Sequence, residues 1–278
     1  MKNFYISIMC LIVFISCSNN ETATSSDSDE QMKQTYFTEF MACKAGPDYS
    51  AESMTSMISE WQNLLTDESL VGAWGYVPAV ETNSRGDTLW WELQWTSQES
   101  ADIAWSNWVQ NEDASLWDEK YKSVLDCNGE NRSSYDVAYP IASNAFGELP
   151  DSGYFYAEVH MCEYNEGSSK KDAINFLPGF SNAVNKADYS DTSYHYGNYF
   201  QQGNDDVFLW GNFTNSKDSM DKVNAAFEES VRDSMFPIFS EFASCGEVPD
   251  LYHGWTLYWS ADNCLLYTSD AADDRGCV

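Results

Sequence analysis

The feature that most constrains the fold is an internal duplication. Residues 36–43 (YFTEFMAC) begin one copy, and residues 155–162 begin a recognisable second copy. Adding 119 to a residue number in the first copy gives its partner in the second. The clearest pairs are Glu39 with Glu158, Cys43 with Cys162, Ser50 with Ser169, and Trp61 with Phe180. Whatever unit the first copy forms, we expect the second copy to form again.

Each copy has the pattern strand, helix, strand, strand, helix, strand. The expected strands of the first copy are residues 36–43, 71–80, 88–95 and 135–143, and those of the second are 155–162, 194–201, 207–213 and 252–260. The two middle strands of each copy are short β-prone runs separated by turn residues, which is typical of a hairpin.

Apolar residues at helical spacing predict the helices between these strands. One helix begins at Ser50 and its partner at Ser169, where Asp172 follows at the spacing of a capping box. The second helix of the first copy begins near Ser100. We expect this helix and its partner to break and resume, at residues 111–115 and at Pro237.

This β-α-β-β-α-β order is the ferredoxin-like split motif. Two such copies, residues 35–143 and 154–263, joined by a linker at 144–153, resemble the dimeric α+β barrel superfamily with both halves in one chain. The resemblance rests on element order and duplication. It implies an α+β fold in which two repeats pair as a pseudo-dimeric barrel, so that the chain acts as a monomer. The alternative is two units with little contact and no internal cavity.

Cysteine spacing agrees with this topology. Outside the two chain ends, four cysteines remain, at gaps of 84 and 83 residues: Cys43, Cys127, Cys162 and Cys245. In the split motif, the first strand ends at the edge where the last strand begins, so Cys43 would meet Cys127, and Cys162 would meet Cys245. Only this pairing gives each repeat its own disulfide. A redox or metal site is the competing interpretation, but no C-x-x-C spacing supports it.

The N-terminus has the pattern of a secretory signal peptide. A short apolar run follows Lys2 and ends at Cys17, and it is shorter than the roughly 20 residues that span a bilayer. Residues 14–17 (FISC) resemble a bacterial lipoprotein signal, which implies cleavage after residue 16 and lipidation of Cys17. Phe14 departs from the usual leucine, so ordinary cleavage stays open. Residues 18–34 are polar, and we expect a disordered tether.

The C-terminal residues 264–278 resemble the translation of a sequencing adapter. The alternative is a genuine tail. As an artefact, they would form no part of the fold or of the site.

The overall charge excludes one class of partner. The formal net charge is −30, and nucleic-acid binding needs clustered lysines and arginines that neutralise phosphates. We therefore expect no nucleic-acid partner, and contact with a membrane only through the lipid anchor. The signal predicts an exported position in the bacterial cell envelope, and the acidic charge is typical of a solvated surface.

Motifs of the commoner enzymes are absent from the sequence. It contains no G-x-G-x-x-G, P-loop, H-E-x-x-H or nucleophile-elbow pattern. The three histidines, His160, His195 and His253, fall on different strands without paired spacing, so we expect no metal site and no cofactor.

Strand alternation predicts a lined cavity inside the barrel. In residues 89–95 (LWWELQW), Trp91, Leu93 and Trp95 form the face expected to pack on helices, and the opposite face carries Trp90, Glu92 and Gln94. In the second copy we expect Val207, Leu209 and Phe213 to pack on helices, opposite Phe208, Trp210 and Asn212. The second set on each strand is aromatic and polar, which suits a small-molecule site.

Two glutamates are expected to approach the same space. Glu39 and Glu158 are repeat partners on the first strands, so the pseudo-twofold axis would bring both into the barrel. The alternative is that each lies at a strand end or in a sealed hydrogen-bond network. Eight of the eleven tryptophans lie in the first copy, which suggests that any site uses the two halves unequally.

These observations support three functions. The first is a non-catalytic binding lipoprotein that holds a partly aromatic or apolar small molecule. The second, implied by the superfamily resemblance, is a cofactor-independent monooxygenase or isomerase, with Glu158 or His160 as general base and Trp90 or Trp210 positioning the substrate. The third is an interaction module of the cell envelope.

Overall fold

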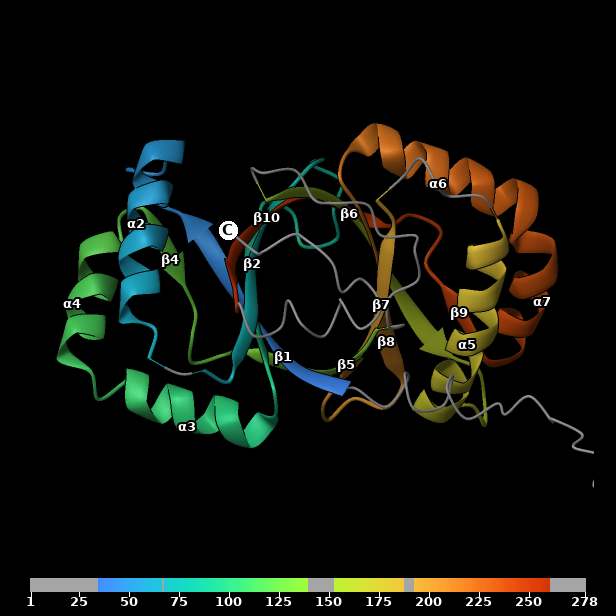
Figure 1. Cartoon of the computed structure of the whole chain (residues 1–278), viewed down its shortest axis with the longest axis horizontal. Coiled ribbons are helices and arrows are strands. Elements are labelled where there is room, and N and C mark those ends of the chain that lie inside the picture. Colours follow the sequence, from blue (N-terminus) through green and yellow to red (C-terminus); the bar gives the residue numbers. More distant parts are fainter. Residues whose placement is uncertain (1–34, 67, 140–152, 188–192, 261–278) are drawn as a thin grey trace, which may run out of the picture.

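The structure is a computed structural model that describes residues 35–66, 68–139, 153–187 and 193–260. The chain forms a central β-barrel with one layer of helices on each side (Figure 1). The expected signal peptide, tether and tail, nearly all of the linker, and residues 140–143 of one expected strand lie outside the described residues.

Both copies have the predicted order of elements, and each has one additional short strand. The first copy contains β1 (Thr35–Ala45), α2 (Ala51–Leu64), β2 (Leu70–Pro78), β3 (Leu89–Trp95), α3 (Gln98–Trp108), α4 (Glu112–Tyr121), β4 (Leu125–Cys127) and β5 (Ser133–Ala138). The second contains β6 (Tyr154–Tyr164), α5 (Lys170–Lys186), β7 (His195–Gln201), β8 (Val207–Thr214), α6 (Lys217–Ser230), α7 (Arg232–Phe242), β9 (Ala243–Cys245) and β10 (Asp250–Trp259).

The two sheets join into one closed barrel. The strand order is β10-β2-β3-β1-β5-β7-β8-β6, and β6 pairs with β10 to close the circle. Within each copy the last strand pairs with the first, the first with the third, and the third with the second, as in a ferredoxin-like unit. The copies meet where β5 pairs with β7 and β10 with β2, both antiparallel. These two junctions exclude the alternative of separate units.

Each copy covers the outer face of its own sheet with three helices. In Figure 1, α2, α3 and α4 lie on one side of the barrel, and α5, α6 and α7 on the other. The predicted capping box is confirmed, since the Ser169 backbone N–H donates to Asp172 Oδ2 at 2.9 Å. The repeat has a second box at the partner position, where the Ser50 N–H donates to Ser53 Oγ at 3.0 Å.

The predicted break at Pro237 is wrong. The helix of the second copy is interrupted at Val231, between α6 and α7, and Pro237 lies inside α7. Proline removes one backbone donor, which leaves the carbonyl of Asp233 without its helical partner. Both residues are exposed, so water can satisfy that carbonyl and the helix continues. The break predicted in the first copy is confirmed, with Asn111 capping the start of α4.

The predicted disulfide pairing is confirmed. Cys43 is bonded to Cys127, with Cα atoms 4.0 Å apart, and Cys162 to Cys245, with Cα atoms 3.9 Å apart. In each case the two cysteines lie directly opposite each other, in β1–β4 and in β6–β9. The disulfide therefore ties the first strand of each copy to the segment that follows its last helix.

Candidate functional site

The inner face of β3 is the one that alternation predicted. Trp91, Leu93 and Trp95 are buried in the core beneath the helices of the first copy. Glu92 and Gln94 lie on the opposite side, inside the barrel, and both are buried. Trp90, on the same side, contributes to the wall of a cavity there.

The predicted faces of β8 are reversed. Phe208 and Trp210 belong to the core beneath the second-copy helices, and Asn212 lies on the same face, where it accepts a hydrogen bond from Trp210 Nε1 at 2.9 Å. Val207, Leu209 and Phe213 contribute to the wall of the barrel cavity. Alternation alone could not decide, because aromatic residues occur on both faces of this strand. The repeat register could have decided, since adding 119 to Trp91 gives Trp210.

The two glutamates do not share a space. Glu39 accepts a hydrogen bond from Trp105 Nε1 of α3 at 2.6 Å. It also forms an ion pair with Arg132, whose Nε lies 2.9 Å away. Glu158 accepts bonds from Asn224 Nδ2 of α6 at 3.1 and 3.2 Å. Trp105 and Asn224 are themselves repeat partners. Each glutamate therefore lies on the outer face of its own sheet and binds its own helix, because its strand parity places it there.

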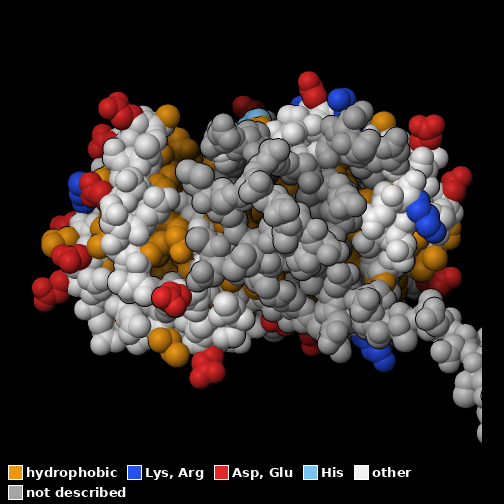
Figure 2. Space-filling view, in the orientation of Figure 1, with side chains coloured by type: hydrophobic (Ala, Val, Ile, Leu, Met, Phe, Trp, Pro, Cys, Tyr) orange, Lys and Arg blue, Asp and Glu red, His pale blue; other side chains and the backbone are white. Residues whose placement is uncertain are grey.

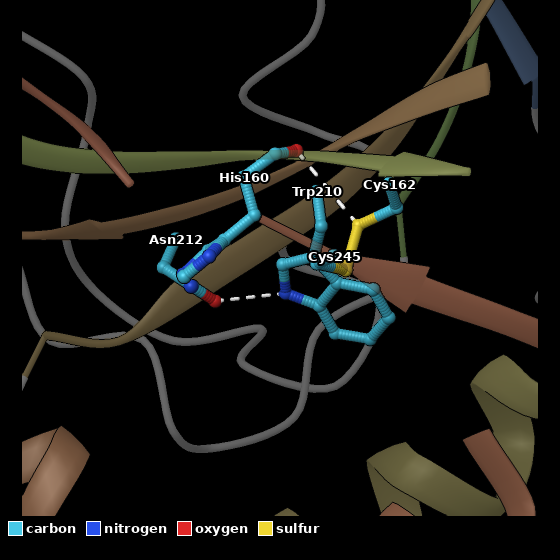
Figure 3. Close-up of a disulfide and its surroundings, with 5 residues drawn as sticks. All are labelled: His160, Cys162, Trp210, Asn212 and Cys245. Carbon is cyan, nitrogen blue, oxygen red and sulfur yellow. Dashed lines mark hydrogen bonds between the residues drawn. A yellow bond between two sulfur atoms is a disulfide. The ribbon is translucent and has the colours of Figure 1, made fainter. Parts of the chain in front are cut away.

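His160 lies on the same outer face as Glu158. It is directly opposite Trp210 in the β6–β8 pairing, and Figure 3 shows it beside Trp210, Asn212 and the second disulfide. Burial lowers the pKa of His160 from its ordinary value. Neither His160 nor Glu158 lines either of the two cavities described below. A role for them as general bases remains a prediction.

A buried carboxylate lies inside the barrel. Glu92 is 1% exposed; it accepts a hydrogen bond from Thr38 Oγ1 at 3.0 Å and a short one from the hydroxyl of Tyr76. Burial raises the pKa of Glu92 to about 7, although the two hydrogen bonds act in the opposite direction. Within the described ranges, no lysine or arginine forms an ion pair with it.

The barrel encloses a small cavity of about 160 Å³ beside this carboxylate. Tyr76 links the two, because it lines the cavity and bonds to Glu92. The other inward-facing aromatic side chains in its wall are Phe40, Trp90, Tyr135, Tyr199, Phe213 and Tyr252. The chain thus has the aromatic interior that the sequence predicted, but at a modest volume.

A larger cavity, which sequence reasoning missed, lies in the first copy between the sheet and its helices. Its volume is about 390 Å³. Six tryptophans contribute to its wall: Trp61, Trp91, Trp95, Trp105, Trp108 and Trp117. In Figure 2, hydrophobic side chains are visible beside α2, on this side of the molecule. The concentration of tryptophan in the first copy was the one signal that pointed here.

The polar groups of this cavity are few. The guanidinium of Arg132 lies 4.0 Å from the ring centre of Trp105 and is paired with Glu39. Asp118 and Glu130 also contribute to the wall. Thr66, Asn107 and Asn111 add neutral polar groups, so the site is an aromatic chamber with one neutralised cation and two additional acidic side chains.

The corresponding space in the second copy is filled by rings. Phe176 and Phe180 of α5 pack on Trp210, with ring centres 6.1 and 4.9 Å away. Phe239 and Phe242 of α7 add to the same cluster, each with its ring centre 5.5 Å from that of Phe176. The two copies have the same backbone topology, but they differ in the side chains that lie between the sheet and the helices.

Among the residues that the structure describes, no group of three or more His, Cys, Asp or Glu side chains is placed to hold a metal ion. In the same ranges, no helix combines the length and the apolarity needed to cross a membrane.

Comparison with known proteins identifies the fold. No protein-family model matches the sequence, and no curated protein does either. Among solved structures, a Fusobacterium nucleatum protein provisionally described as a monooxygenase has a TM-score of 0.50 at 13% identity, covering 82% of this chain and 94% of its own. A variant of chlorite dismutase from Candidatus Nitrospira defluvii has a TM-score of 0.46 at 13% identity, covering 80% and 92%. The likeness to the Fusobacterium nucleatum protein shows the fold alone, and it agrees with two ferredoxin-like repeats joined in one α+β barrel.

Proposed function

We propose that the protein is an exported, lipid-anchored binding protein that holds a small, flat and largely apolar molecule in the first-copy cavity. The observation that carries the proposal is this chamber of about 390 Å³ walled by six tryptophans. Small-molecule sites have volumes of about 300 to 1,000 Å³ and are lined by apolar and aromatic side chains with a few polar groups. The cavity meets each of these conditions.

The surrounding structure supports binding rather than simple core packing. The cavity has a disulfide-linked sheet on one side and α2, α3 and α4 on the other. Tryptophan offers a large rigid face and loses little side-chain entropy when it contacts a ligand. A planar ring system between such faces gains both apolar burial and aromatic contacts.

Filling the cavity tests the proposal. Ala104 contributes to the cavity wall, and its neighbour Ile103 on the same helix is 53% exposed. We expect Ala104→Phe to weaken binding of the neutral fluorescent probe N-phenyl-1-naphthylamine by about tenfold or more, whereas the matched control Ile103→Phe leaves it unchanged. Equal binding by both variants would place the probe elsewhere and contradict the proposal.

The anchoring part of the proposal is supported by the sequence alone, since Cys17 lies outside the described residues. Cys17→Ser should abolish incorporation of labelled palmitate and move the protein from the membrane fraction to the soluble fraction. Palmitate incorporation that persists in this variant would exclude a lipid anchor at this cysteine.

A second candidate function is acid–base catalysis in the barrel. The observation that favours it is Glu92, whose pKa is raised to about 7 and which bonds to Tyr76 in the cavity wall. A general base is most effective when its pKa lies near the working pH. Glu92→Gln should then abolish turnover of a substrate, while Glu158→Gln and His160→Ala should not. The reverse result would restore the assignment expected from the sequence.

A further inference from the structure

The aromatic wall of the barrel cavity is accessible from inside the barrel. Pairing of β6 with β10 closes the ring of strands, so an inward side chain is reached only through the barrel's interior or its ends. Four of the inward rings that line the cavity are nonetheless partly exposed: Phe40, Trp90, Tyr135 and Phe213. A ligand inside the barrel can therefore contact these rings.

The rings come from several strands and lie close to one another. The ring centre of Phe40 lies 5.6 Å from that of Tyr135 and 5.7 Å from that of Tyr199. Tyr76 has its ring centre 6.1 Å from Phe40 and 6.0 Å from Tyr252. All five residues line the cavity. Aromatic faces carry negative potential, and sites that bind organic ammonium ions are commonly built from several such rings.

A carboxylate without a counter-ion lies behind this wall. Glu92 is bonded to Tyr76 and Thr38 and is 1% exposed, so it acts on a ligand through its charge rather than by contact. Within the described ranges it has no ion pair. Charges attract over longer distances in a buried site than in water. A cation in the cavity would therefore stabilise the ionised form of Glu92.

The remaining charges of the wall balance each other. Arg85 and Asp250 both line the cavity, and they contribute one positive and one negative charge. Arg85 lies in the turn between β2 and β3 and is exposed, so water screens its guanidinium. With Glu92 ionised, the surroundings of the cavity are negative, as is the chain as a whole with its formal net charge of −30.

We propose that the barrel cavity binds a small organic ammonium ion, held among the aromatic rings and balanced by the charge of Glu92. The volume of about 160 Å³ restricts the ligand to a compact cation such as a methylated amine. This site is separate from the first-copy cavity, so the inference does not depend on the ligand proposed there.

Three probes of similar shape and different charge test the inference. Choline is the cation, 3,3-dimethylbutan-1-ol replaces its nitrogen with carbon, and 3,3-dimethylbutanoate carries a negative charge on the same branched group. In titration calorimetry with the full chain at about pH 8, above the pKa of Glu92, we expect choline to bind about tenfold more tightly than the alcohol. The carboxylate should bind more weakly than either.

Replacement of the carboxylate separates the effect of its charge from that of the rings. Glu92→Gln keeps the size of the side chain and removes the charge, so it should weaken choline binding about tenfold and leave binding of the alcohol unchanged. The matched control Glu158→Gln lies on the outer face of the sheet and should change neither. Choline affinity that is equal in Glu92→Gln and the unaltered protein would overturn the role of the buried charge.

Filling the barrel locates the site. Val159 lines the cavity, and Val248 is 77% exposed. Val159→Phe should abolish choline binding, whereas the matched control Val248→Phe and the first-copy variant Ala104→Phe should retain it. Choline binding that persists in Val159→Phe would overturn the proposed site. Equal binding of choline and the alcohol, or tighter binding of the carboxylate, by the unaltered protein would overturn the inference even if Val159→Phe failed to fold.

Discussion

The two halves of the molecule have the same topology and opposite interiors. In the second half, phenylalanine rings fill the space beneath the helices, with Phe239 and Phe242 only 5.0 Å apart between ring centres. In the first half, tryptophans surround a cavity of about 390 Å³. Because the two copies share one barrel, the closely packed second copy can stabilise the first copy, which contains the cavity. Duplication can thus free one copy from the demand for close packing.

Helix length accompanies this difference. The helices of the second copy are longer, with 17 residues in α5 against 14 in α2, and 14 in α6 against 11 in α3. α6 also continues into α7 through the single residue Val231, whereas residues 109–111 separate α3 from α4. The longer, nearly continuous helices of the second copy bring more side chains over the sheet.

Removal of a disulfide should have the largest effect on the free energy of unfolding, and the effect should be similar in the two halves. They close loops of 84 and 83 residues, so the chain-entropy model gives each about 4.5 kcal/mol. We expect Cys43→Ala/Cys127→Ala and Cys162→Ala/Cys245→Ala to lose similar unfolding free energy in urea. Losses that differ by more than about 2 kcal/mol would show that one half depends on its disulfide and the other does not.

Truncation of a core side chain should destabilise the second half more than the first. Met57 and Phe176 are repeat partners, and both are buried. Phe176→Ala creates a new cavity in a packed cluster and should cost about 4 kcal/mol, whereas Met57→Ala enlarges an existing cavity and should cost about 2 kcal/mol. Urea unfolding of both variants measures the difference. An equal or greater loss for Met57→Ala would contradict the contrast in packing.

The sequence predicted those features that local pattern determines. Element order, the capping box at Ser169 and the disulfides follow from periodicity, residue type and the duplication. The short strands β4 and β9 have three residues each, too few for alternation to be visible. The face of β8 was misjudged because Phe208, Leu209 and Trp210 are all apolar, so that only the register to the first copy distinguishes them.

The candidate site was less predictable than the fold. The inward direction of Glu92 follows from alternation with Trp91, and the structure agrees. The larger cavity depends on where α3 and α4 lie over the sheet, which is a property of tertiary packing rather than of any one segment. Neither Trp91 nor Trp95 differs in pattern from a core tryptophan, so their place in the cavity wall is visible only in three dimensions.

The free energy of unfolding should depend on pH through one carboxylate of the first half, Glu92. Gly211 is the repeat partner of Glu92, so this carboxylate has no counterpart in the second half. Its pKa is raised from 4.5 to about 7, which means that the folded state holds its proton more tightly than the unfolded state. The resulting stability is complete below pH 4.5 and is lost as the pH rises through 7, by about 3 kcal/mol.

Comparison with Glu92→Gln isolates this effect. Burial lowers the pKa of His195 to about 4, so its contribution has the opposite sign and is lost as the pH falls from 6.5 toward 4. The two effects oppose each other in the unaltered protein. We therefore expect Glu92→Gln to gain about 3 kcal/mol relative to the unaltered protein between pH 4.5 and 7.5, measured by urea unfolding. A pH-independent difference would mean that Glu92 titrates normally.

The smallest expected contrast concerns the paired glutamates. Glu39 is 3% exposed and holds Arg132, so Glu39→Gln leaves a half-buried guanidinium without its counter-ion and should cost about 2 kcal/mol. Glu158 accepts its hydrogen bonds from the amide of Asn224, and a glutamine can keep one of them, so Glu158→Gln should cost less than about 0.5 kcal/mol. Urea midpoints of the two variants measure the contrast. Similar losses would indicate that the glutamates have equal structural roles, and that the halves differ only in the aromatic residues around the cavity.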